Sequence, residues 1–419
     1  MQSQLRVLYI AYWGAAEPLG QSLILPAVKK LAELGVDLTL VTFEKPADLG
    51  RTANLDDLRD SLKRFKVSWI PLLYHKRPRI PATAFDVAHG CARAVAMSLK
   101  ARPDIVHART FIGGLIGLAL APLLGARLIF HNEGFYPDEQ VDGGVWTAGS
   151  TQHRVATYLE QRMYARADGI IAMSGRAKDV IEGFPAVRRR GTPVIVVPSC
   201  VDLDHFRAGP YPVAGQPGLR LVYIGSVGGR YILDRIGRFA AVASEMLGDV
   251  RLRVLTRAEP DLVASMLDSG GLDRSHWSAE AVAHEAMPAE LAGHDAGLFF
   301  LTQGLSEHGC SPTKIGEYWA MGMPVVTTPN VSDIDAIIRQ ERVGVIVNDH
   351  SDAGYRRAIA ELQTLLRDPD LPDRCRRAAE THYALTPACE RQVNLYHRVI
   401  RRSRGATAPS TVRAFDDKD

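Results

Sequence analysis

The sequence predicts an α/β protein with two doubly wound, Rossmann-like domains that face each other across a cleft. Residues 6–43 read as a strand, a glycine-bearing loop, a helix and a second strand, which is the order of a βαβ unit in a parallel sheet. The same order restarts at Leu219. Between the two units, residues 208–218 contain three prolines and three glycines, a composition typical of a linker. We therefore expect domains at residues 1–208 and 209–386.

The bulk composition narrows the classes of function. With 419 residues, of which 46% are hydrophobic and 23% charged, the chain is long enough for two globular cores. The formal net charge of +3 gives no indication of a nucleic-acid partner. The five cysteines are scattered without a disulfide or zinc spacing, which favours a reducing cytoplasm. We expect a cytoplasmic protein without a leader peptide, and we interpret residues 111–126 as a buried helix because about 18 apolar residues are needed to span a bilayer.

The N-terminal domain is predicted to alternate strands with helices. The strands are expected at residues 6–11, 36–43, 66–71, 103–108, 125–131, 169–174 and 193–198. Helices are expected at residues 22–35, 86–100 and 111–126, in a segment that closes at 158–167, and from residue 175 to 182. Residues 74–79, Tyr-His-Lys-Arg-Pro-Arg, form a basic loop that is either a solvated connector or a contact for an acidic acceptor or a membrane surface.

Two polar clusters follow strands of this domain, at the edge where open α/β sheets bind their ligands. His107 and Arg109 close one strand: Arg109 could clamp a phosphate or a carboxylate, whereas His107 could be an ordinary buried histidine. The second cluster offers aromatic rings to stack on a sugar and polar groups to orient or deprotonate an acceptor hydroxyl; its candidates are His131, Glu133, Tyr136 and Asp138. Asp138 could equally cap the helix that follows.

The C-terminal domain repeats the alternation. Its strands are expected at residues 219–225, 251–255, 296–301, 324–328 and 344–347. Its helices are expected at residues 231–247, 289–293, 312–320, 333–339, 352–366 and 372–383, followed by a terminal helix at 387–402. Residues 404–419 are polar, lack a core pattern and are expected to be disordered.

A glycine-rich turn opens this domain and offers a first wall for an anion. Gly225 and Ser226 begin a turn that ends at Arg230, directly before a predicted helix. Backbone N–H groups at a helix start, together with an arginine, suit a diphosphate. The end of the next strand, at Thr256, should border the base of a nucleotide.

A second helix start is predicted at Ser311, with Ser311 as the N-cap and Pro312 at the first helical position. Thr313 and Lys314 place a hydroxyl and a cation in the first turn, where the helix dipole favours a phosphate. Glu317 lies four residues beyond Thr313, on the same face, where a carboxylate could accept two hydrogen bonds from a vicinal diol. Phosphate donors and a diol acceptor together indicate a nucleotide site, although an ordinary capped helix with a solvated glutamate has the same pattern.

The segment 311–326 resembles the donor motif of retaining family-4 glycosyltransferases of GT-B fold. Glu317 and the run Ala-Met-Gly-Met-Pro-Val-Val match the closing half of the Glu-x7-Glu motif, in the variant with Ser-Pro-Thr-Lys. The position of the first glutamate holds Gly309, and the nearest acid is Glu307. Further resemblance implies that the loop with Gly20 faces the donor and that the turn before Met287 touches its base.

The resemblance covers residues 6–402 and implies an activity. It implies a metal-independent hexosyl- or N-acetylhexosaminyltransferase of bacterial polysaccharide or glycoconjugate biosynthesis, with a nucleotide-sugar, favoured to be UDP-linked, as co-substrate and no other cofactor. The acceptor would be a glycan, a lipid-linked sugar or a small molecule, with peripheral membrane contact. The expected catalytic residues are His107, Arg109, His131 and Glu307. The sequence gives no oligomeric state.

Two other classes stay open. A nucleotide-sugar epimerase of the same fold would need acids around the sugar, and Glu133, Asp138 and Glu307 could supply them. A catalytically weak nucleotide-sugar-binding subunit is the other, because Gly309 stands where the motif has a glutamate. Incubating the protein with a labelled nucleotide sugar alone separates an epimerase from a transferase.

Overall fold

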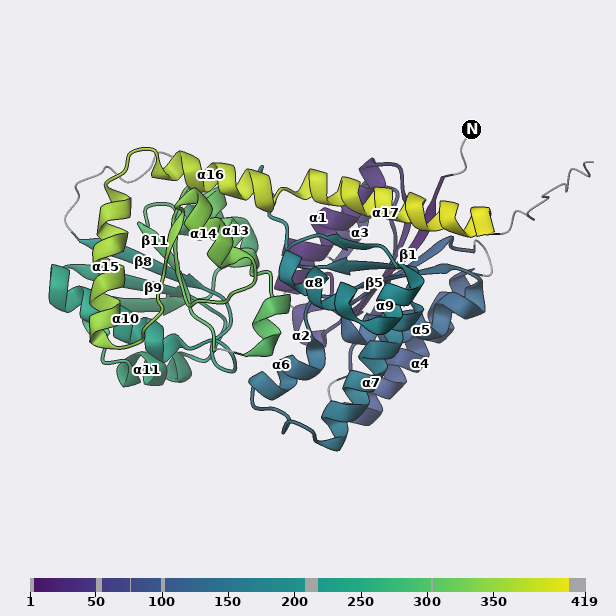
Figure 1. Ribbon diagram of the computed structural model, residues 1–419, viewed down its shortest axis with the longest axis horizontal. Helices are drawn as coiled ribbons and strands as arrows, with labels where there is room; N and C mark the ends of the chain where they lie inside the picture. Colours follow the sequence, from purple (N-terminus) through teal and green to yellow (C-terminus); the bar gives the residue numbers. More distant parts are fainter. Residues whose placement is uncertain are drawn as a thin grey trace, which may run out of the picture.

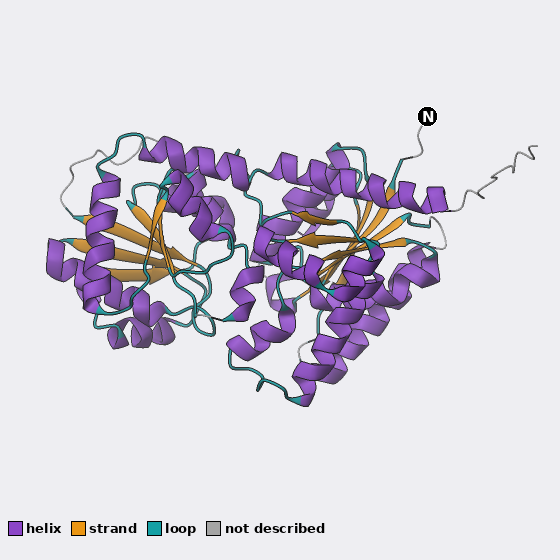
Figure 2. Ribbon diagram, viewed as in Figure 1, coloured by secondary structure: helices purple, strands orange, loops and turns teal. Residues whose placement is uncertain are grey.

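The computed structural model describes residues 4–49, 55–75, 77–98, 102–207, 218–302 and 304–406. Two α/β domains lie side by side, each with a parallel sheet enclosed by helices (Figures 1 and 2). This confirms the predicted fold class of two Rossmann-like domains. The proposed linker, apart from Gly218, lies outside the described residues. Residues 407–419 of the tail, which was expected to be disordered, also lie outside them.

The N-terminal sheet has seven parallel strands in the order β3-β2-β1-β4-β5-β6-β7. Their bounds are β1 (Arg6–Ala11), β2 (Asp37–Glu44), β3 (Ser68–Leu73), β4 (Ile105–Arg109), β5 (Arg127–His131), β6 (Gly169–Ala172) and β7 (Val194–Val196). The order reverses between β1 and β4, so the loops after these two strands diverge and leave room for a ligand at the carboxyl edge of the sheet.

Helices cover both faces of this sheet. They are a π-helical turn (Gly20–Ile24), α1 (Leu25–Glu33), α2 (Pro46–Leu49), α3 (Leu55–Arg64), α4 (Arg79–Ser98), α5 (Thr110–Leu124), α6 (Tyr136–Asp142), α7 (Thr151–Arg166), α8 (Gly175–Gly183) and α9 (Pro185–Arg190). The helix expected at 111–126 is α5, and residues inside it such as Ile116 and Leu120 are buried. In the part of the chain that the structure describes, no helix is long and apolar enough to cross a membrane.

The C-terminal sheet has six parallel strands in the order β10-β9-β8-β11-β12-β13. Their bounds are β8 (Leu219–Ile224), β9 (Val250–Leu255), β10 (Trp277–Glu280), β11 (Ala296–Phe299), β12 (Val325–Thr327) and β13 (Gly344–Ile346). Strand β10 was not predicted. It lies at the edge of the sheet, and only its first residue is buried, so it lacks the apolar run that marked the other strands.

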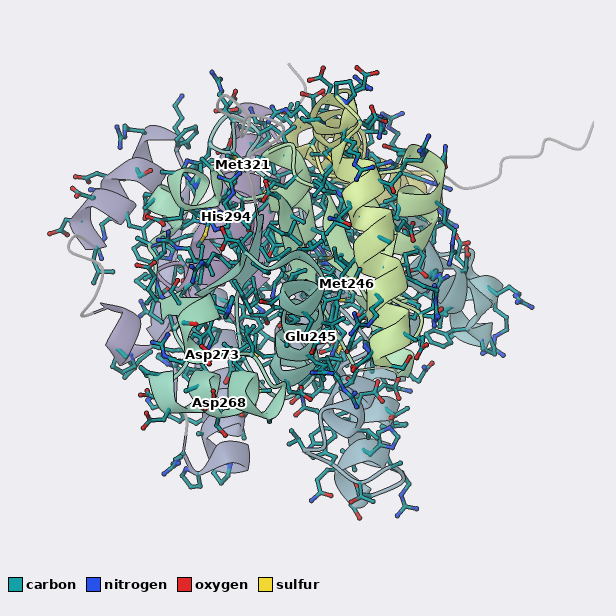
Figure 3. The ribbon with its side chains drawn as sticks, turned by 90° about the vertical axis from the view of Figure 1, so that its left-hand side faces the viewer. Glu245, Met246, Asp268, Asp273, His294 and Met321 are labelled. Atoms are coloured by element: carbon teal, nitrogen blue, oxygen red, sulfur yellow. The ribbon has the colours of Figure 1, made fainter. Side chains whose placement is uncertain are left out.

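The helices of this domain are α10 (Leu233–Leu247), α11 (Pro260–Ser269), α12 (Met287–Leu291), α13 (Thr313–Ala320), α14 (Ile334–Glu341), α15 (Asp352–Leu366) and α16 (Leu371–His382). Among them, α11 was not predicted, and the bounds of the others lie within two residues of the predicted ones. Helix α14 has Asp333, the first residue of the predicted helix, at its N-cap. Seen from its far end, the domain exposes acidic side chains such as Glu245 on α10 and Asp268 on α11 (Figure 3).

The terminal helix α17 (Leu385–Ala406) returns to the N-terminal domain. Figure 1 shows α16 and α17 following one another along one side of both domains. Leu395, Tyr396 and Val399 pack into the core that contains Val7 of β1 and Ile129 of β5. The helix begins before and ends after the predicted 387–402, and Arg402 donates a hydrogen bond to Gly191 O of the N-terminal domain.

Candidate functional site

The ammonium group of Lys314 lies in an aromatic cage at the start of α13. Its Nζ is 4.4 Å from the ring centre of Tyr231 and 5.0 Å from those of Tyr223 and Phe299. Among the described residues it has no ion-pair partner, and burial lowers the pKa of Lys314 to about 8. Cation–π attraction holds the charge but does not neutralise it. The ammonium therefore lies at a helix start with no ion-pair partner in the described chain, although the nearby Glu317 acts to raise its pKa, and a further anion is favoured there.

The glycine turn after β8 meets this helix start. Gly225 has a φ of +118°, and a Cβ there would lie 2.5 Å from Lys314 Nζ, so only glycine lets the ammonium approach. Gly228 and Gly229 also have positive φ angles. Ser226 is exposed, and its carbonyl accepts a hydrogen bond from the Tyr223 hydroxyl. The two helix starts predicted from the sequence, at residues 231 and 312, thus lie close together. The first of these helices, α10, begins two residues later than predicted, at Leu233.

Pro312, at the N-cap of α13, provides no side-chain cap, so within the described chain no side chain caps the backbone N–H groups of the first turn, at Thr313 and Lys314. Glu317 lies one turn further along the helix and is 7% exposed. Burial raises the pKa of Glu317 to about 7, and the nearby Lys314 opposes this rise. Within the described residues its carboxylate accepts no hydrogen bond, so it is available to a ligand hydroxyl.

Ser311 does not cap α13, which corrects the sequence interpretation. Its Oγ instead accepts a hydrogen bond of 3.0 Å from the backbone N–H of Ser199 in the other domain. Because Ser199 follows β7, this bond fastens the start of the candidate site to the segment that connects the domains. Local sequence could not indicate a partner more than a hundred residues away.

Arg230 closes the glycine turn and reaches the other domain. Its Nη1 lies 3.3 Å from Oε1 of Glu139 on α6. Cys310 lies beside the same guanidinium, and burial raises the pKa of its thiol. Arg230 is thus placed near Lys314 as predicted, but it is paired with a carboxylate that the sequence analysis did not propose.

Thr256 and Met287 lie where the base of a nucleotide was expected. Both are nearly buried, at 7% and 8% exposure. The Thr256 N–H donates to Glu280 O over 2.8 Å, and its Oγ1 accepts from the N–H of Ala258. Met287 begins α12. The two residues follow the ends of neighbouring strands β9 and β10, so they border one edge of the sheet.

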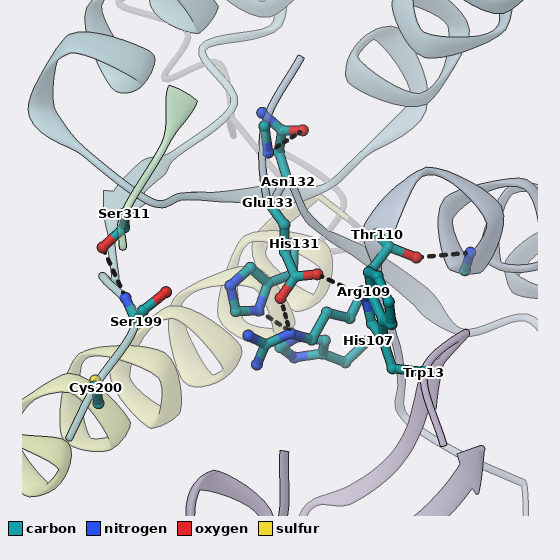
Figure 4. A network of polar contacts seen from close by, with 12 residues as sticks. Trp13, His107, Arg109, Thr110, His131, Asn132, Glu133, Ser199, Cys200 and Ser311 are labelled. Carbon is teal, nitrogen blue, oxygen red and sulfur yellow. Dashed lines mark hydrogen bonds and ion pairs between the residues drawn. The ribbon is translucent and has the colours of Figure 1, made fainter. Parts of the chain in front are cut away.

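The N-terminal wall of the cleft is built around Arg109, which is 4% exposed (Figure 4). Its Nε donates to Glu133 Oε1, and its Nη1 donates to the Tyr9 hydroxyl over 3.2 Å. Trp13 Nε1 donates to the second oxygen of Glu133 over 3.1 Å. Arg109 therefore clamps a carboxylate of the chain itself, and the predicted acceptor residue Glu133 is held by two donors.

His107 and His131 form a buried pair beneath this wall. His107 Nε2 lies 3.1 Å from His131 Nδ1, and His107 Nδ1 lies 2.6 Å from the hydroxyl of Tyr396 on α17. Burial lowers the pKa of both histidines well below their usual value, so the pair is neutral. His107 has no exposed surface and both nitrogens are occupied, which fits a residue that positions others. His131 Nε2 has no partner in the described chain.

The loop that carries Glu307 and Gly309 packs against α6. Glu307 is 1% exposed, and its Oε2 accepts from the Gly304 N–H over 2.5 Å, within its own turn. A Cβ at Gly309 would lie 3.0 Å from the Cα of Gly134. Glycine at this position is thus explained by close contact between the two domains. Asp142 accepts from the Ser306 N–H over 2.9 Å and strengthens that contact.

Aromatic rings gather at the start of α6. Tyr136 stacks on Phe111 at 4.6 Å and meets the edge of Trp146 at 5.7 Å. Asp138, by contrast, pairs with His153, with 3.7 Å between Oδ1 and Nε2, so it supports the α6–α7 corner. Tyr136 is only partly buried and remains a candidate for contact with an acceptor.

The loop with Gly20 is occupied by the chain's own carboxylates. A Cβ at Gly20 would lie 1.9 Å from Gly14 O, so glycine is required for this tight loop. The N–H groups of Ala15 and Ala16 donate to Glu44, and that of Gly14 donates to Glu17. These amides are therefore engaged rather than open to a phosphate.

The basic loop after β3 contains an acid–imidazole pair that sequence reasoning missed. His75 Nδ1 lies 2.6 Å from Oδ1 of Asp86, which is fully buried and also accepts from the Tyr12 hydroxyl. Lys76 lies outside the described residues. The sequence signal was a lone acid, Asp86, on the predicted helix 86–100, and it could not be assigned a partner eleven residues away.

Comparison with known proteins places the chain among sugar-transferring folds. Residues 23–205 match the family model Glycosyltransferase Family 4, and residues 219–364 match Glycosyl transferases group 1. No curated protein matches the sequence.

Solved structures match over nearly the whole chain. Sucrose-phosphate synthase from Thermosynechococcus elongatus has a TM-score of 0.66 at 15% identity, over 95% of this chain and 100% of its own. Anabaena HepE, solved with UDP and glucose, has a TM-score of 0.62 at 12% identity, over 96% and 100%. The catalytic domain of starch synthase IV from Arabidopsis thaliana, bound to ADP and acarbose, has a TM-score of 0.65 at 11% identity, over 96% and 100%. At these identities the likeness shows the GT-B fold.

Proposed function

The chain joins a Glycosyltransferase Family 4 domain to a group 1 glycosyl transferase domain in a GT-B fold, and we propose that it moves a sugar from a nucleotide-sugar donor to an acceptor hydroxyl. The observation that carries this proposal is the unneutralised ammonium of Lys314 between the glycine turn and the uncapped start of α13. We propose a UDP-linked hexose or N-acetylhexosamine as donor, which the UDP complexes of HepE support.

The proposed donor contacts follow from the charges of the site. Lys314, Arg230 and the free N–H groups at the start of α13 would neutralise the diphosphate as it leaves, which is electrostatic stabilisation of a developing charge. Glu317, in its ionised form, would accept the two hydroxyls of the ribose. These cations can supply the charge stabilisation for which other enzymes use a metal, which supports a metal-independent reaction.

We propose that the anomeric configuration is retained. In such a reaction the departing phosphate oxygen takes the acceptor proton, so the N-terminal wall needs no separate general base. That wall would orient the acceptor: the partly exposed rings of Phe111, Tyr136 and Trp146 suit the apolar face of a sugar. Glu133 would be held by Arg109 for a hydrogen bond to an acceptor hydroxyl.

Two of the acids that an epimerase would need are engaged within the protein. Asp138 is paired with His153, and Glu307 accepts with one oxygen from the N–H of Gly304 in its own turn. This favours transfer to an acceptor over epimerisation.

Calorimetric titration with UDP and UDP-glucose, and with GDP and dTDP as alternatives, tests the donor site. Lys314→Met should weaken UDP binding at least tenfold, because a charge-assisted contact contributes about 1.5–3 kcal/mol. Lys178→Met, at a partly exposed lysine of the N-terminal domain that pairs with Glu182, is the matched control. Labelled UDP-sugar with and without glycan or lipid-linked acceptors then tests transfer. Epimerised donor in the absence of acceptor would contradict the proposed reaction.

A further inference from the structure

A surface pocket of about 420 Å³ lies between the last turns of α5 and α7. It is at the amino-terminal edge of the N-terminal sheet, whereas the candidate donor site faces the carboxyl edge. Figure 1 places α5, α9 and the end of α17 at the end of the molecule away from the C-terminal domain. No residue of the pocket belongs to the site described above. The pocket has an apolar floor that includes Leu118, Ala121 and Pro122, and a polar rim of Arg162, Arg166, Arg190 and the carboxylate of Asp168.

The three arginines of the rim differ in their partners. Arg190 is committed to the fold, since its Nη1 donates to Ala165 O over 2.8 Å and its Nη2 lies 3.4 Å from Asp168 Oδ1. Arg162 and Arg166 are exposed and make no hydrogen bond or ion pair with any residue in the described ranges. They lie four residues apart on one face of α7, where like charges repel. Their repulsion therefore lowers the stability of the free protein, and a bound anion would remove this repulsion.

The surroundings of the pocket are apolar and basic. Leu123, next to Pro122 on α5, is 72% exposed, the highest value among the exposed large hydrophobic residues of the described chain. Arg188 and Arg189 on α9 are exposed beside the rim. Arg402, on α17, donates to Gly191 O over 2.7 Å and brings a further cation to this end of the molecule. This end of the molecule thus presents an exposed leucine and several exposed arginines.

We propose that this surface, the α5–α7 basic pocket, docks on an anionic phospholipid surface. One lipid phosphate would lie between the guanidinium groups of Arg162 and Arg166, which present fixed pairs of donors to phosphate oxygens. The glycerol and upper acyl carbons would cover the floor, and Leu123 would enter the interface. A dissolved phosphate would satisfy the arginines but leave the floor and Leu123 in water, so the combination favours a lipid.

Docking in this way fixes an orientation. The pocket lies at the amino-terminal edge of the N-terminal sheet, whereas Arg109 and Glu133 lie at its carboxyl edge, so the side of the domain with these two residues would face away from the lipid surface. The acceptor hydroxyl would then be reached at a distance from the bilayer. This inference does not depend on the proposed sugar transfer, because it concerns a separate face of the protein.

Co-sedimentation of the full chain with vesicles tests the proposal. Vesicles of three parts phosphatidylcholine and one part phosphatidylglycerol should bind the protein at 0.1 M salt, whereas pure phosphatidylcholine vesicles should not. Arg162→Glu combined with Arg166→Glu should weaken binding at least tenfold, and Leu123→Ser should weaken it several-fold. The matched control carries the same change of charge at exposed arginines of the other domain, Arg367→Glu with Arg377→Glu.

The control separates a specific pocket from general charge. Equal loss of vesicle binding in both double variants, or no binding by the wild type, would overturn the proposal. Binding to soluble polyglutamate but not to vesicles would assign the surface to an acidic protein and would also overturn it. Unchanged vesicle binding in the presence of 10 mM inorganic phosphate supports a lipid, and full displacement by it contradicts one. The urea midpoint of each variant, followed by tryptophan fluorescence, shows that the fold is intact.

Discussion

Replacing Lys314 by methionine should stabilise the free protein and weaken nucleotide binding at the same time. Burial lowers the pKa of Lys314 from 10.5 to about 8, even with three aromatic rings around the ammonium. At about 1.4 kcal/mol per pH unit, this difference corresponds to about 3 kcal/mol by which the folded state disfavours the charge at neutral pH. Methionine keeps the length of the side chain and removes the charge, so the free energy of unfolding should rise by about 1–3 kcal/mol.

The added stability of Lys314→Met depends on pH, because the pKa of Lys314 is lower in the folded state than in the unfolded state. Below about pH 8 the lysine is protonated in the folded and the unfolded states, and the full cost is present. Between about pH 8 and 10.5 the folded state has released the proton while the unfolded state still holds it, so wild-type stability rises with pH. The advantage of Lys314→Met should therefore shrink over this range.

Urea denaturation followed by tryptophan fluorescence measures this difference, because Trp319 is fully buried in the same domain. Unfolding should be compared at pH 7 and pH 9.5 for the wild type, Lys314→Met and the surface control Lys178→Met. The UDP affinity of each protein is measured in parallel. The reasoning is refuted if Lys314→Met is no more stable than the wild type at pH 7, or if it binds UDP equally well.

Three further predictions concern other parts of the site. UDP affinity should rise as pH increases through about 7, because Glu317 must ionise to accept hydroxyls, and should fall above about pH 8 as Lys314 loses its proton. In calorimetric titrations, Glu317→Gln should remove the rise in affinity near pH 7. Gly309→Glu should separate the domains, because even a Cβ there is too close to the loop before α6. Solution scattering should then show a larger radius of gyration than for Gly183→Glu, a position with no neighbour within 4 Å. Tyr396→Phe should lower the free energy of unfolding by about 1–3 kcal/mol, since it leaves a buried histidine nitrogen unpaired, and an unchanged urea midpoint would contradict this.

The fold could be predicted from the sequence because its signals are local. Strand β1 and helix α15 have the predicted bounds, since buried apolar runs and caps are read within a few residues. Strand β10 was missed for the opposite reason: three of its four residues are exposed, and only its neighbour β9 makes it a strand.

The candidate donor residues could also be proposed from the sequence, because their signals are local too. Lys314 and Glu317 lie on one short helix, so their spacing alone places both at its start and on neighbouring faces. The contacts of the N-terminal wall around Arg109 could not be predicted from local sequence. Glu133 is 24 residues from Arg109, and their ion pair exists only because β4 and β5 are neighbours in the sheet. Roles assigned to such residues one by one overlooked that they bind each other.

Arg230 belongs to the C-terminal domain and contacts the N-terminal domain, so it can link donor binding to closure of the two domains. In the free protein it pairs with Glu139, while Asp142, one turn further along α6, accepts from the Ser306 N–H. Asp333 joins the domains at a second place, where it accepts from the N–H groups of Gly175 and Arg176 at the start of α8.

A guanidinium group has five N–H donors, so Arg230 can hold the carboxylate of Glu139 and a phosphate together. A diphosphate that binds Lys314 then gains a contact to Arg230 only while α6 is docked. Closure and donor binding should therefore strengthen each other, and the coupling free energy must act equally in both directions. Loss of the Glu139 carboxylate would leave Arg230 charged but without its partner on α6, so Glu139→Gln should weaken both UDP binding and domain closure.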